Sequence, residues 1–239
     1  MAQNSTEAAA IVAAKAGPRK GEGSISDAIN YFIRNNRKKI IIAAIVVVVI
    51  ALGFIAWVLI RDALENRAIA QVEDLTVRYE ALRFDINEAD SAEDVAALLT
   101  DMLDLGKGSF GYAAARAYAL AAAVCADQKN WAGAENYWML SAAKGKNMYL
   151  GPVSIYNAAV AAEEAGNIEA ALEHYRDAAS RAEFPGAVRA QFAMGRLLEQ
   201  SDTAAAIEVY RQIASEWSTE TVWVNLAQSR IIILSLKAE

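Results

Sequence analysis

The sequence predicts an all-α protein in which a single transmembrane helix precedes a solenoid of helical hairpins. The chain has 239 residues and only 3 prolines, so little in it interrupts a helix. From Ile40 to Ile60 no charged side chain occurs. Alanine, the strongest helix former, supplies 40 of the 179 residues that follow Ile60. In this alanine-rich part, a pairing of Ala with an aromatic residue recurs at spacings of 37 and 35 residues.

Two segments come before the apolar run. Residues 1–23 lack a sustained apolar period and are expected to form a disordered cytoplasmic tail, because they cannot bury enough surface to fold. Residues 24–39 are expected to form a basic juxtamembrane helix, with the capping-box spacing of Ser24 and Asp27 at its start. This helix either lies on the inner surface of the membrane or extends the span, and the sequence leaves both arrangements open.

The apolar run 40–60 is expected to be an uncleaved transmembrane helix. At about 1.5 Å rise per residue it spans the roughly 30 Å hydrocarbon layer. Four basic residues precede it, and the positive-inside rule therefore keeps the N-terminus in the cytoplasm; they are Arg34, Arg37, Lys38 and Lys39. Residues 61–239 carry 16 basic and 26 acidic side chains. This acidic part gives no electrostatic reason to expect nucleic acid or anionic lipid as a partner.

Residues 61–90 are expected to form a stalk helix and a loop. The helix has one apolar stripe with spacings of 4, 3, 4 and 3 residues, formed by Ala68, Val72, Leu75, Tyr79 and Leu82. We favour packing of this stripe on the chain's own domain over a coiled coil between chains, because two heptads are few for a coiled coil.

A further helix is expected from Ser91 to Gly106. The loop from Gly106 to Gly111 then matches G-x-G-x-x-G, but a helix precedes it where the dinucleotide motif needs a strand. We expect a helix-to-helix turn there.

Residues 91–239 are expected to contain helical hairpins in repeated register. Each unit places a small Ala four residues before an aromatic residue, and each follows an alanine-rich helix. The pairs are Ala134 with Trp138, Ala171 with Tyr175 and Ala206 with Tyr210, and the preceding helices are 112–126, 154–165 and 187–199. This pattern resembles a tetratricopeptide array, in which Ala lets paired helices approach and the aromatic residue fills the gap. Residues 221–236 are expected to form the closing helix.

Catalytic and metal-binding chemistry has few residues to rest on. Cys125 and His174 are the single Cys and the single His of the chain. We expect Cys125 to be a small buried hydrophobe and His174 to be a surface or packing residue. The adjacent Glu163 and Glu164 point in different directions on a helix and cannot form a carboxylate pair. The sequence therefore predicts no enzyme activity, no cofactor, no metal and no small-molecule substrate.

The whole plan resembles the YfgM-like family of bacterial inner-membrane proteins with a periplasmic tetratricopeptide-like domain. The resemblance rests on the juxtamembrane pattern from Ala28 to Lys39, one span, a stalk helix, degenerate repeats and a final amphipathic helix. It implies a membrane-anchored adaptor or chaperone-like module in the periplasm. Such a protein is an ancillary subunit of the Sec translocon, works with a PpiD-like chaperone and assists newly exported proteins. The alternative is a structural scaffold subunit of another cell-envelope assembly.

In tetratricopeptide arrays the first helix of each unit lines a concave face. Transferred to this chain, that register predicts a protein-binding groove rich in aromatic and Arg side chains, the types enriched at binding hot spots. The candidate residues are Arg116, Asp127, Tyr156, Val160, Glu163, Arg189, Phe192 and Arg196. The alternative for Tyr156 and Phe192 is that both are ordinary core residues.

Overall fold

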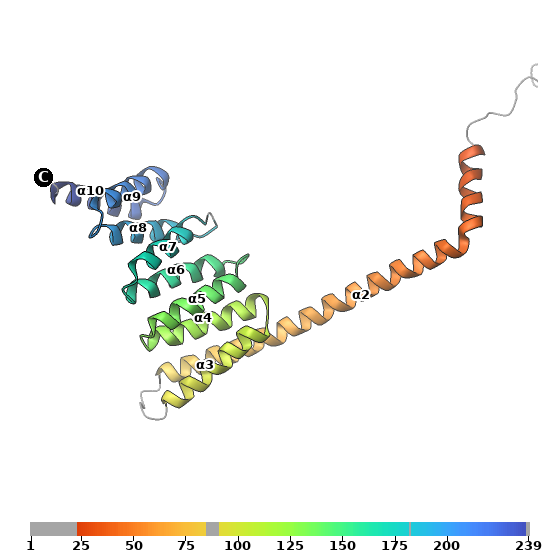
Figure 1. Ribbon diagram of the computed structural model, residues 1–239, viewed down its shortest axis with the longest axis horizontal. Helices are drawn as coiled ribbons and strands as arrows, with labels where there is room; N and C mark the ends of the chain where they lie inside the picture. The colour runs from red at the N-terminus through yellow and green to blue at the C-terminus, as the bar shows by residue number, and fades with distance from the viewer. Residues whose placement is uncertain (1–22, 85–90, 182, 238–239) are drawn as a thin grey trace, which may run out of the picture. The chain divides into compact units, whose positions relative to one another are not determined.

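The computed structural model describes residues 23–84, 91–181 and 183–237 of the chain. In these ranges every regular element is a helix, which confirms the all-α fold class (Figure 1). The chain divides into two compact units, Met1–Arg61 and Asp62–Glu239. The expected tail 1–23 lies outside the described residues except for Gly23, which begins the first helix in Figure 1, α2.

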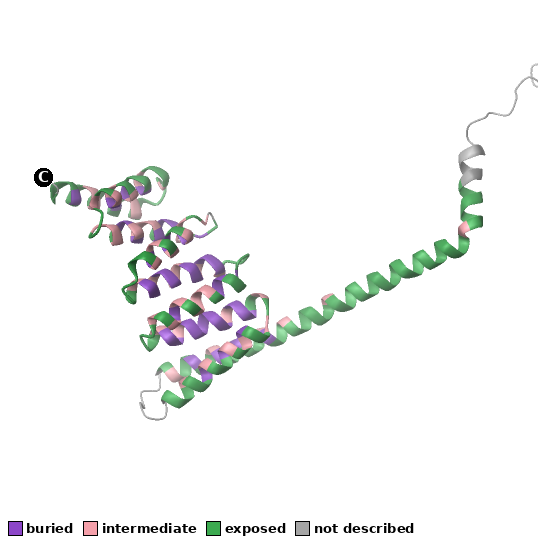
Figure 2. Ribbon diagram, viewed as in Figure 1, coloured by how far each residue is buried: buried purple, intermediate pink, exposed green. Residues whose placement is uncertain are grey.

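The first unit contains the apolar part of α2 (Gly23–Phe84). Residues 24–39 belong to this same continuous helix, and Figure 1 shows a bend near its start. The most apolar 18-residue window has a mean hydropathy of 3.1, and none of it is buried inside the protein. Figure 2 accordingly shows the apolar part of the helix as exposed. By its length and composition, this helix is able to cross a membrane.

The second unit begins with the last part of α2, from Asp62 to Phe84. The apolar stripe predicted there is buried: Val72 is fully inaccessible, and Ala68, Leu75 and Tyr79 are at most 9% exposed. These residues form one core cluster with residues of the next two helices, such as Leu98. The stripe is therefore used inside the chain, which confirms the packing interpretation over a coiled coil between chains.

The rest of the second unit is a series of antiparallel helices joined by short turns. They are α3 (Ser91–Gly108), α4 (Gly111–Asp127), α5 (Trp131–Lys144), α6 (Leu150–Glu164), α7 (Ile168–Ala179), α8 (Ala187–Leu198), α9 (Thr203–Glu216) and α10 (Thr221–Lys237). From α3 onward each helix packs against the next one, and α4 also contacts α6, as α8 contacts α10. This is the packed helical-hairpin arrangement that the period indicated.

Two helix ends differ from the sequence prediction by more than one residue. α6 begins at Leu150 rather than Ser154, and Pro152 lies buried in its first turn. Proline is compatible with this position because the N–H groups of a first turn have no partner inside the helix. α3 continues two residues past Gly106, to Gly108. The G-x-G-x-x-G segment contains a helix-to-helix turn, as expected, at residues 109–110, and Gly111 starts α4 with a φ of +61°.

The repeat register is confirmed by burial at the same position of each unit. Ala134, Ala171 and Ala206 are all fully buried. Four residues later, Tyr175 and Tyr210 are at most 1% exposed, whereas Trp138 is half-buried. These alanines lie on the second helix of each hairpin, where a larger side chain would separate the two helices.

The second helix of each hairpin also starts in the same way. The side chain of the preceding residue accepts a hydrogen bond from the backbone N–H three positions on. Asn130 accepts from Gly133 at 3.1 Å, Asn167 from Ala170 at 3.3 Å and Asp202 from Ala205 at 2.9 Å. Asn and Asp are among the best N-cap residues because they satisfy one of the free N–H groups at a helix start. The caps therefore recur with the period of the alanines.

The buried alanines give a test of the repeat register. Ala171→Leu is expected to lower the melting temperature of the chain by several degrees. Extra methylenes in a packed core cost about 1–3 kcal/mol, and about 1 kcal/mol shifts a domain of this size by roughly 2–4 °C. Ala204→Leu, on the exposed side of α9, is the matched control and should melt close to the natural chain. Circular dichroism can follow the melting of both variants. Equal melting temperatures would contradict the assignment of Ala171 to a helix contact.

Candidate functional site

A three-residue polar cluster joins the last turn of α6 to the next two helices. The carboxylate of Glu163 accepts a hydrogen bond from the Tyr175 hydroxyl of α7 at 2.9 Å. It also accepts one from Nη2 of Arg196 of α8 at 2.6 Å. The neighbouring Glu164 is exposed, so the two adjacent carboxylates do point in different directions.

The same cluster recurs one repeat later. Glu199, directly after α8, accepts from the Tyr210 hydroxyl of α9 at 2.7 Å. Its second partner is Arg230 of α10, whose Nε donates at 2.8 Å and whose Nη2 also donates. The carboxylates of the two clusters are 36 residues apart, the tyrosines 35 and the arginines 34. Each cluster therefore ties a hairpin to the first helix of the next unit.

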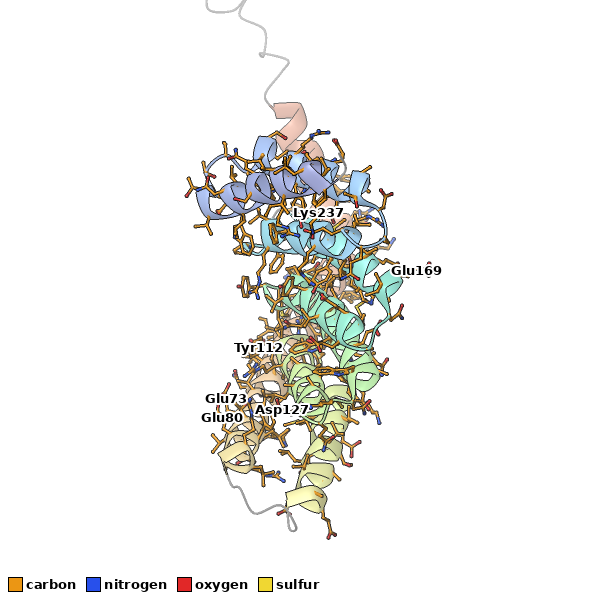
Figure 3. The ribbon with its side chains drawn as sticks, turned by 90° about the vertical axis from the view of Figure 1, so that its left-hand side faces the viewer. Glu73, Glu80, Tyr112, Asp127, Glu169 and Lys237 are labelled. Atoms are coloured by element: carbon orange, nitrogen blue, oxygen red, sulfur yellow. The ribbon has the colours of Figure 1, made fainter. Side chains whose placement is uncertain are left out.

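A related cluster lies at the end of α4 and joins it to α2. Asp127, labelled in Figure 3, accepts a hydrogen bond from the Tyr79 hydroxyl. Its Oδ2 atom also lies 3.0 Å from Nε of Arg83. Asp127 precedes Glu163 by 36 residues and so occupies the same repeat position. Here the tyrosine and the arginine come from the stalk rather than from the following helices.

Burial and the carboxylates together shift the titration of these groups. The pKa values of Tyr79, Tyr175 and Tyr210 are raised, first by burial and then by the hydrogen bond that each hydroxyl makes to a carboxylate. Burial by itself would raise the pKa of Glu199, but hydrogen bonds from Arg230 and Tyr210 outweigh it and lower that pKa. In each cluster the carboxylate therefore lies between a tyrosine hydroxyl and a guanidinium, and the raised pKa keeps the tyrosine protonated at neutral pH.

Aromatic rings lie beside the Glu163 cluster. Tyr156 of α6 has its ring centroid 5.5 Å from that of Tyr175 and 6.0 Å from that of Phe184. The guanidinium carbon of Arg189 lies 5.1 Å from the Tyr156 centroid, within the range of a cation–π contact. Arg189 itself is exposed. Six of the candidate residues lie on α6 and α8, and we call them the α6–α8 surface: Tyr156, Val160, Glu163, Arg189, Phe192 and Arg196.

Phe192 connects the α6–α8 surface to the closing helix. Its ring centroid lies 5.2 Å from Tyr210 of α9 and 5.4 Å from Trp223 of α10. Both Tyr156 and Phe192 are half-buried, and both pack against core clusters. Each ring therefore contributes to the core and still keeps part of its area accessible.

The other two candidate residues have different surroundings. Asp127 has its contacts with α2, as described above. Arg116 lies half-buried on α4. Sequence reasoning missed Glu199, Arg230 and the two stalk residues of the Asp127 cluster. The recurrence of Glu, Tyr and Arg at the repeat spacing could have indicated the first two.

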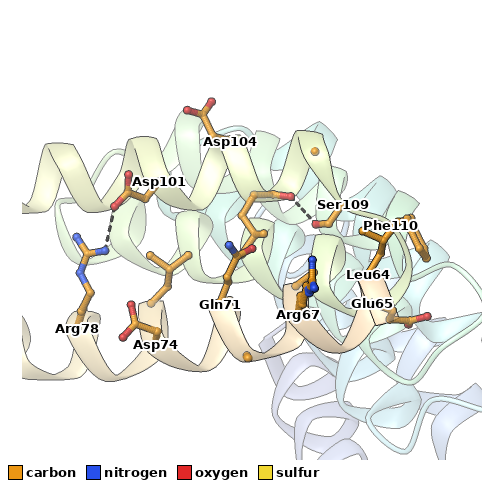
Figure 4. Close-up of a pocket in the computed structure, with 15 residues that line it drawn as sticks. Leu64, Glu65, Arg67, Gln71, Asp74, Arg78, Asp101, Asp104, Ser109 and Phe110 are labelled. Atoms are coloured by element: carbon orange, nitrogen blue, oxygen red, sulfur yellow. Dashed lines mark hydrogen bonds and ion pairs between the residues drawn. The ribbon is translucent and has the colours of Figure 1, made fainter. Parts of the chain in front are cut away.

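A pocket that the sequence analysis did not predict lies between the last part of α2 and α3 (Figure 4). This open pocket has a volume of about 840 Å³. Its wall is partly apolar, with Leu75 and Leu105, and partly charged. Arg78 spans its edge through an ion pair with Asp101 at 2.9 Å. The pocket therefore has both apolar and charged contacts to offer.

Cys125 and His174 occupy places that suit a structural role. Cys125 is 1% exposed in a core cluster, and burial raises the pKa of its thiol. His174 is half-buried on α7, with Nε2 3.0 Å from Oε1 of Glu135 on α5. In the described ranges no group of three or more His, Cys, Asp or Glu side chains is arranged to hold a metal ion.

Comparison with known proteins links this chain to a repeat protein. Over 127 residues the chain is 33% identical to a TPR repeat-containing protein of Treponema pallidum (strain Nichols). The matched part covers 53% of this chain and 53% of that protein, so the chain spans about half the length of the curated relative it matches. No family model matches the chain, and no solved structure matches it significantly. The similarity supports the tetratricopeptide part of the sequence interpretation, and the packed helical hairpins of the structure are consistent with it.

The Glu199 cluster predicts a specific dependence of stability on pH. Because the pKa of Glu199 is lower in the folded chain than its ordinary value near 4.5, its stabilisation is present above that value and is lost as the pH falls through the folded pKa. Glu199→Gln should cost about 1–3 kcal/mol at pH 7 through the weakened hydrogen bonds. Between pH 7 and pH 3 its melting temperature should then fall less than that of the natural chain.

The control for this measurement is Glu208→Gln, because Glu208 is exposed on α9 and lies 3.7 Å from Arg211. The melting temperature of this variant should change with pH in the same way as that of the natural chain. Parallel melting curves for Glu199→Gln and the natural chain between pH 7 and pH 3 would contradict the assigned role of Glu199.

Proposed function

We propose that this chain is a single-pass protein of the bacterial inner membrane that acts as an ancillary subunit of the Sec translocon. In this role it is an adaptor or chaperone-like module that assists newly exported proteins together with a PpiD-like chaperone. One observation carries the proposal: a single chain joins an unburied apolar helix to a helical repeat array with Arg189 and aromatic rings at its surface. The resemblance to the YfgM-like family adds the specific partners.

The proposed division of the chain follows from this role. It comprises a cytoplasmic tail (1–23), a basic juxtamembrane helix (24–39), a span (40–60), a stalk helix with its loop (61–90) and a periplasmic repeat domain (91–239). The end of the span supports the assignment. The guanidinium of Arg61 lies 5.8 Å from the ring of Trp57, and the ring of Phe54 is also 5.8 Å from that ring. Tryptophan is enriched where a transmembrane helix leaves the hydrocarbon layer.

The α6–α8 surface is the proposed docking site for a protein partner. Glu163 and Arg196 neutralise each other, so the net charge available to a partner comes from Arg189. The Arg189 guanidinium is held over the Tyr156 ring, which reduces the entropy lost when a partner carboxylate binds it. The half-buried rings of Tyr156 and Phe192 add apolar area beside this charge. A chain segment that combines an acidic and an apolar side chain fits this surface.

No catalytic step is part of the proposal. Cys125 is buried with a raised thiol pKa, so it is a poor nucleophile. His174 is paired with Glu135 within the repeat array. Tetratricopeptide-like arrays act through extended surfaces, which suits a role in handing on client chains.

The proposed topology can be tested in spheroplasts. Protease added from outside should degrade residues 61–239 and leave the N-terminal part protected, because the basic residues before the span hold that end in the cytoplasm. Tags at the two ends, followed by immunoblotting, report the two parts separately. A C-terminal tag that survives until the membrane is lysed would show the opposite orientation.

Partner docking can be tested with Arg189→Glu in the full-length chain. The reversed charge should repel an acidic partner and reduce by several-fold the translocon and chaperone subunits that co-purify from cross-linked membranes. The melting temperature should stay close to that of the natural chain, because Arg189 is exposed. Arg176→Glu, an exposed arginine on α7, is the matched control.

Equal recovery of the partners with Arg189→Glu and Arg176→Glu would remove the α6–α8 surface from the docking role. Recovery of other envelope proteins, without any translocon subunit, from the natural chain would instead favour the scaffold alternative.

A further inference from the structure

The exposed aromatic side chains of the second unit lie at one edge of the repeat array. Among the side chains of this unit that the structure describes, the exposed aromatic residues are Phe110, Tyr112 and Tyr149, at 37%, 39% and 66%. Phe110 and Tyr112 lie where α3 passes into α4, and Tyr149 lies in the turn between α5 and α6. Figure 1 shows both turns at the same end of the antiparallel helices. The accessible rings are therefore gathered on one side of the array.

Contacts join these two turns to the start of the stalk part of α2. A Cβ atom added to Gly111 would lie 3.0 Å from Oε1 of Glu65 and 3.8 Å from Cε of Met148. Leu64, the neighbour of Glu65, lines the same pocket as Phe110 (Figure 4). We call the five exposed apolar residues at this place the stalk-side edge: Leu64, Phe110, Tyr112, Met148 and Tyr149.

The turn between α5 and α6 is closed by its own backbone. The N–H of Met148 donates to the carbonyl of Gly145 at 2.8 Å, and the N–H of Gly151 donates to the carbonyl of Met148 at 3.0 Å. A Cβ atom on Gly151 would lie 2.7 Å from the Gly145 oxygen, so a larger residue does not fit there. Tyr149 therefore projects from a compact turn, and most of its side chain stays uncovered by the described part of the chain.

The stalk-side edge is connected to the end of the proposed span by a very short piece of chain. Leu64 follows Ile60 by four residues on the continuous helix α2, which corresponds to about 6 Å along the helix. The headgroup layer on each side of the hydrocarbon core is about 5–8 Å thick. If the span ends at Ile60, Leu64 lies at the level of the headgroups. The turns that contact its neighbour Glu65 then lie beside the same layer.

The side chains of the stalk-side edge suit the boundary between water and lipid. Tyrosine has an apolar ring and a polar hydroxyl, and it is enriched where membrane proteins meet the headgroups. The charges nearby do not oppose this contact, although the second unit as a whole is acidic. Residues 144–149 contain Lys144 and Lys146 and no acidic side chain, whereas Asp62 and Glu65 lie within two residues of Leu64. Acidic and basic groups are therefore equal in number in these two segments.

We propose that the stalk-side edge rests on the surface of the membrane that holds the span, with the rings of Phe110, Tyr112 and Tyr149 among the lipid headgroups. This inference goes beyond the adaptor role, and it rests on the proposed span 40–60. The contact holds the repeat array against the membrane by a second attachment besides the helix. The edge is separate from the α6–α8 surface, which stays available to a protein partner.

Fluorescence quenching by lipids tests the contact in the full-length chain. Asn147→Cys, labelled with bimane in phosphatidylcholine vesicles, should be quenched by lipids that carry a nitroxide near the headgroup, because residue 147 lies in the α5–α6 turn. Cys125 is 1% exposed, so the introduced thiol is the one that the label reaches. Gln128→Cys is the matched control at the far end of the 17-residue α4, about 25 Å away. Its label should be quenched several-fold less.

Substitutions of Tyr149 test whether its ring makes the contact. In the labelled Asn147→Cys chain, Tyr149→Ser should reduce the quenching several-fold, whereas Tyr149→Trp should keep it, because tryptophan also favours the headgroup region. Ile168→Ser, at an exposed apolar residue at the start of α7, is the matched control and should leave the quenching unchanged. The melting temperature in detergent should be the same for all of these chains. Quenching that Tyr149→Ser leaves unchanged would contradict the role of this ring.

Flotation of the vesicles distinguishes failure of the span from failure of the membrane contact. The chain should float with the vesicles and resist extraction at high pH. A chain that does not float would contradict the span and, with it, the contact of the stalk-side edge. A chain that floats but is quenched equally at residues 147 and 128 would overturn the membrane contact alone and favour a protein partner for this edge. Arg189→Glu should change neither measurement, so partner docking is tested separately.

Discussion

The close approach of alanine-rich helices is the constraint on which the second unit depends. At Ala134, Ala171 and Ala206 the side chain is a single methyl group with no accessible area, so two helices can pack at short distance. The tyrosine rings then fill the space left beside these contacts. The fit is close at Gly195, where an added Cβ atom would lie 2.6 Å from the Tyr210 ring. Because close packing leaves no room for larger side chains, the same residue sizes must recur in each repeat.

Polar clusters add direction to this packing. Apolar contacts alone allow helices to slide, whereas the Glu163 and Glu199 clusters join three consecutive helices through hydrogen bonds of defined geometry. Arg196 and Arg230 are already paired with these carboxylates, so their charges are not available to a partner. Arg189 differs, because it lies over a ring and is exposed. In the proposed docking role, a few such side chains on the repeat array would recognise the partner.

The two ends of the array differ in how far their apolar side chains are covered. At the first end, the stripe of α2 around Val72 covers the core next to α3 and α4. Tyr79 and Arg83 of α2 also supply the polar cluster at Asp127 that the following helices supply elsewhere. At the other end α10 covers its neighbours with one face and leaves a second apolar stripe exposed. The stalk therefore covers the array at one end, whereas apolar side chains of α10 remain exposed at the other.

The sequence by itself determined the features that depend on periodicity and residue size: the apolar run, the buried side of the stalk, and the three alanine contacts with their aromatic partners. These follow from local spacing, because helix geometry alone decides which residues share a face. Only the tertiary structure decided which side chains meet across helices. Glu163 reaches Tyr175 and Arg196, and Asp127 turns to the stalk instead, because the neighbours of a carboxylate depend on how whole helices are placed. The tertiary structure also decided how far Tyr156 and Phe192 are buried. Both rings are partly core and partly surface, and residue type and spacing alone cannot distinguish such a ring from a fully buried one.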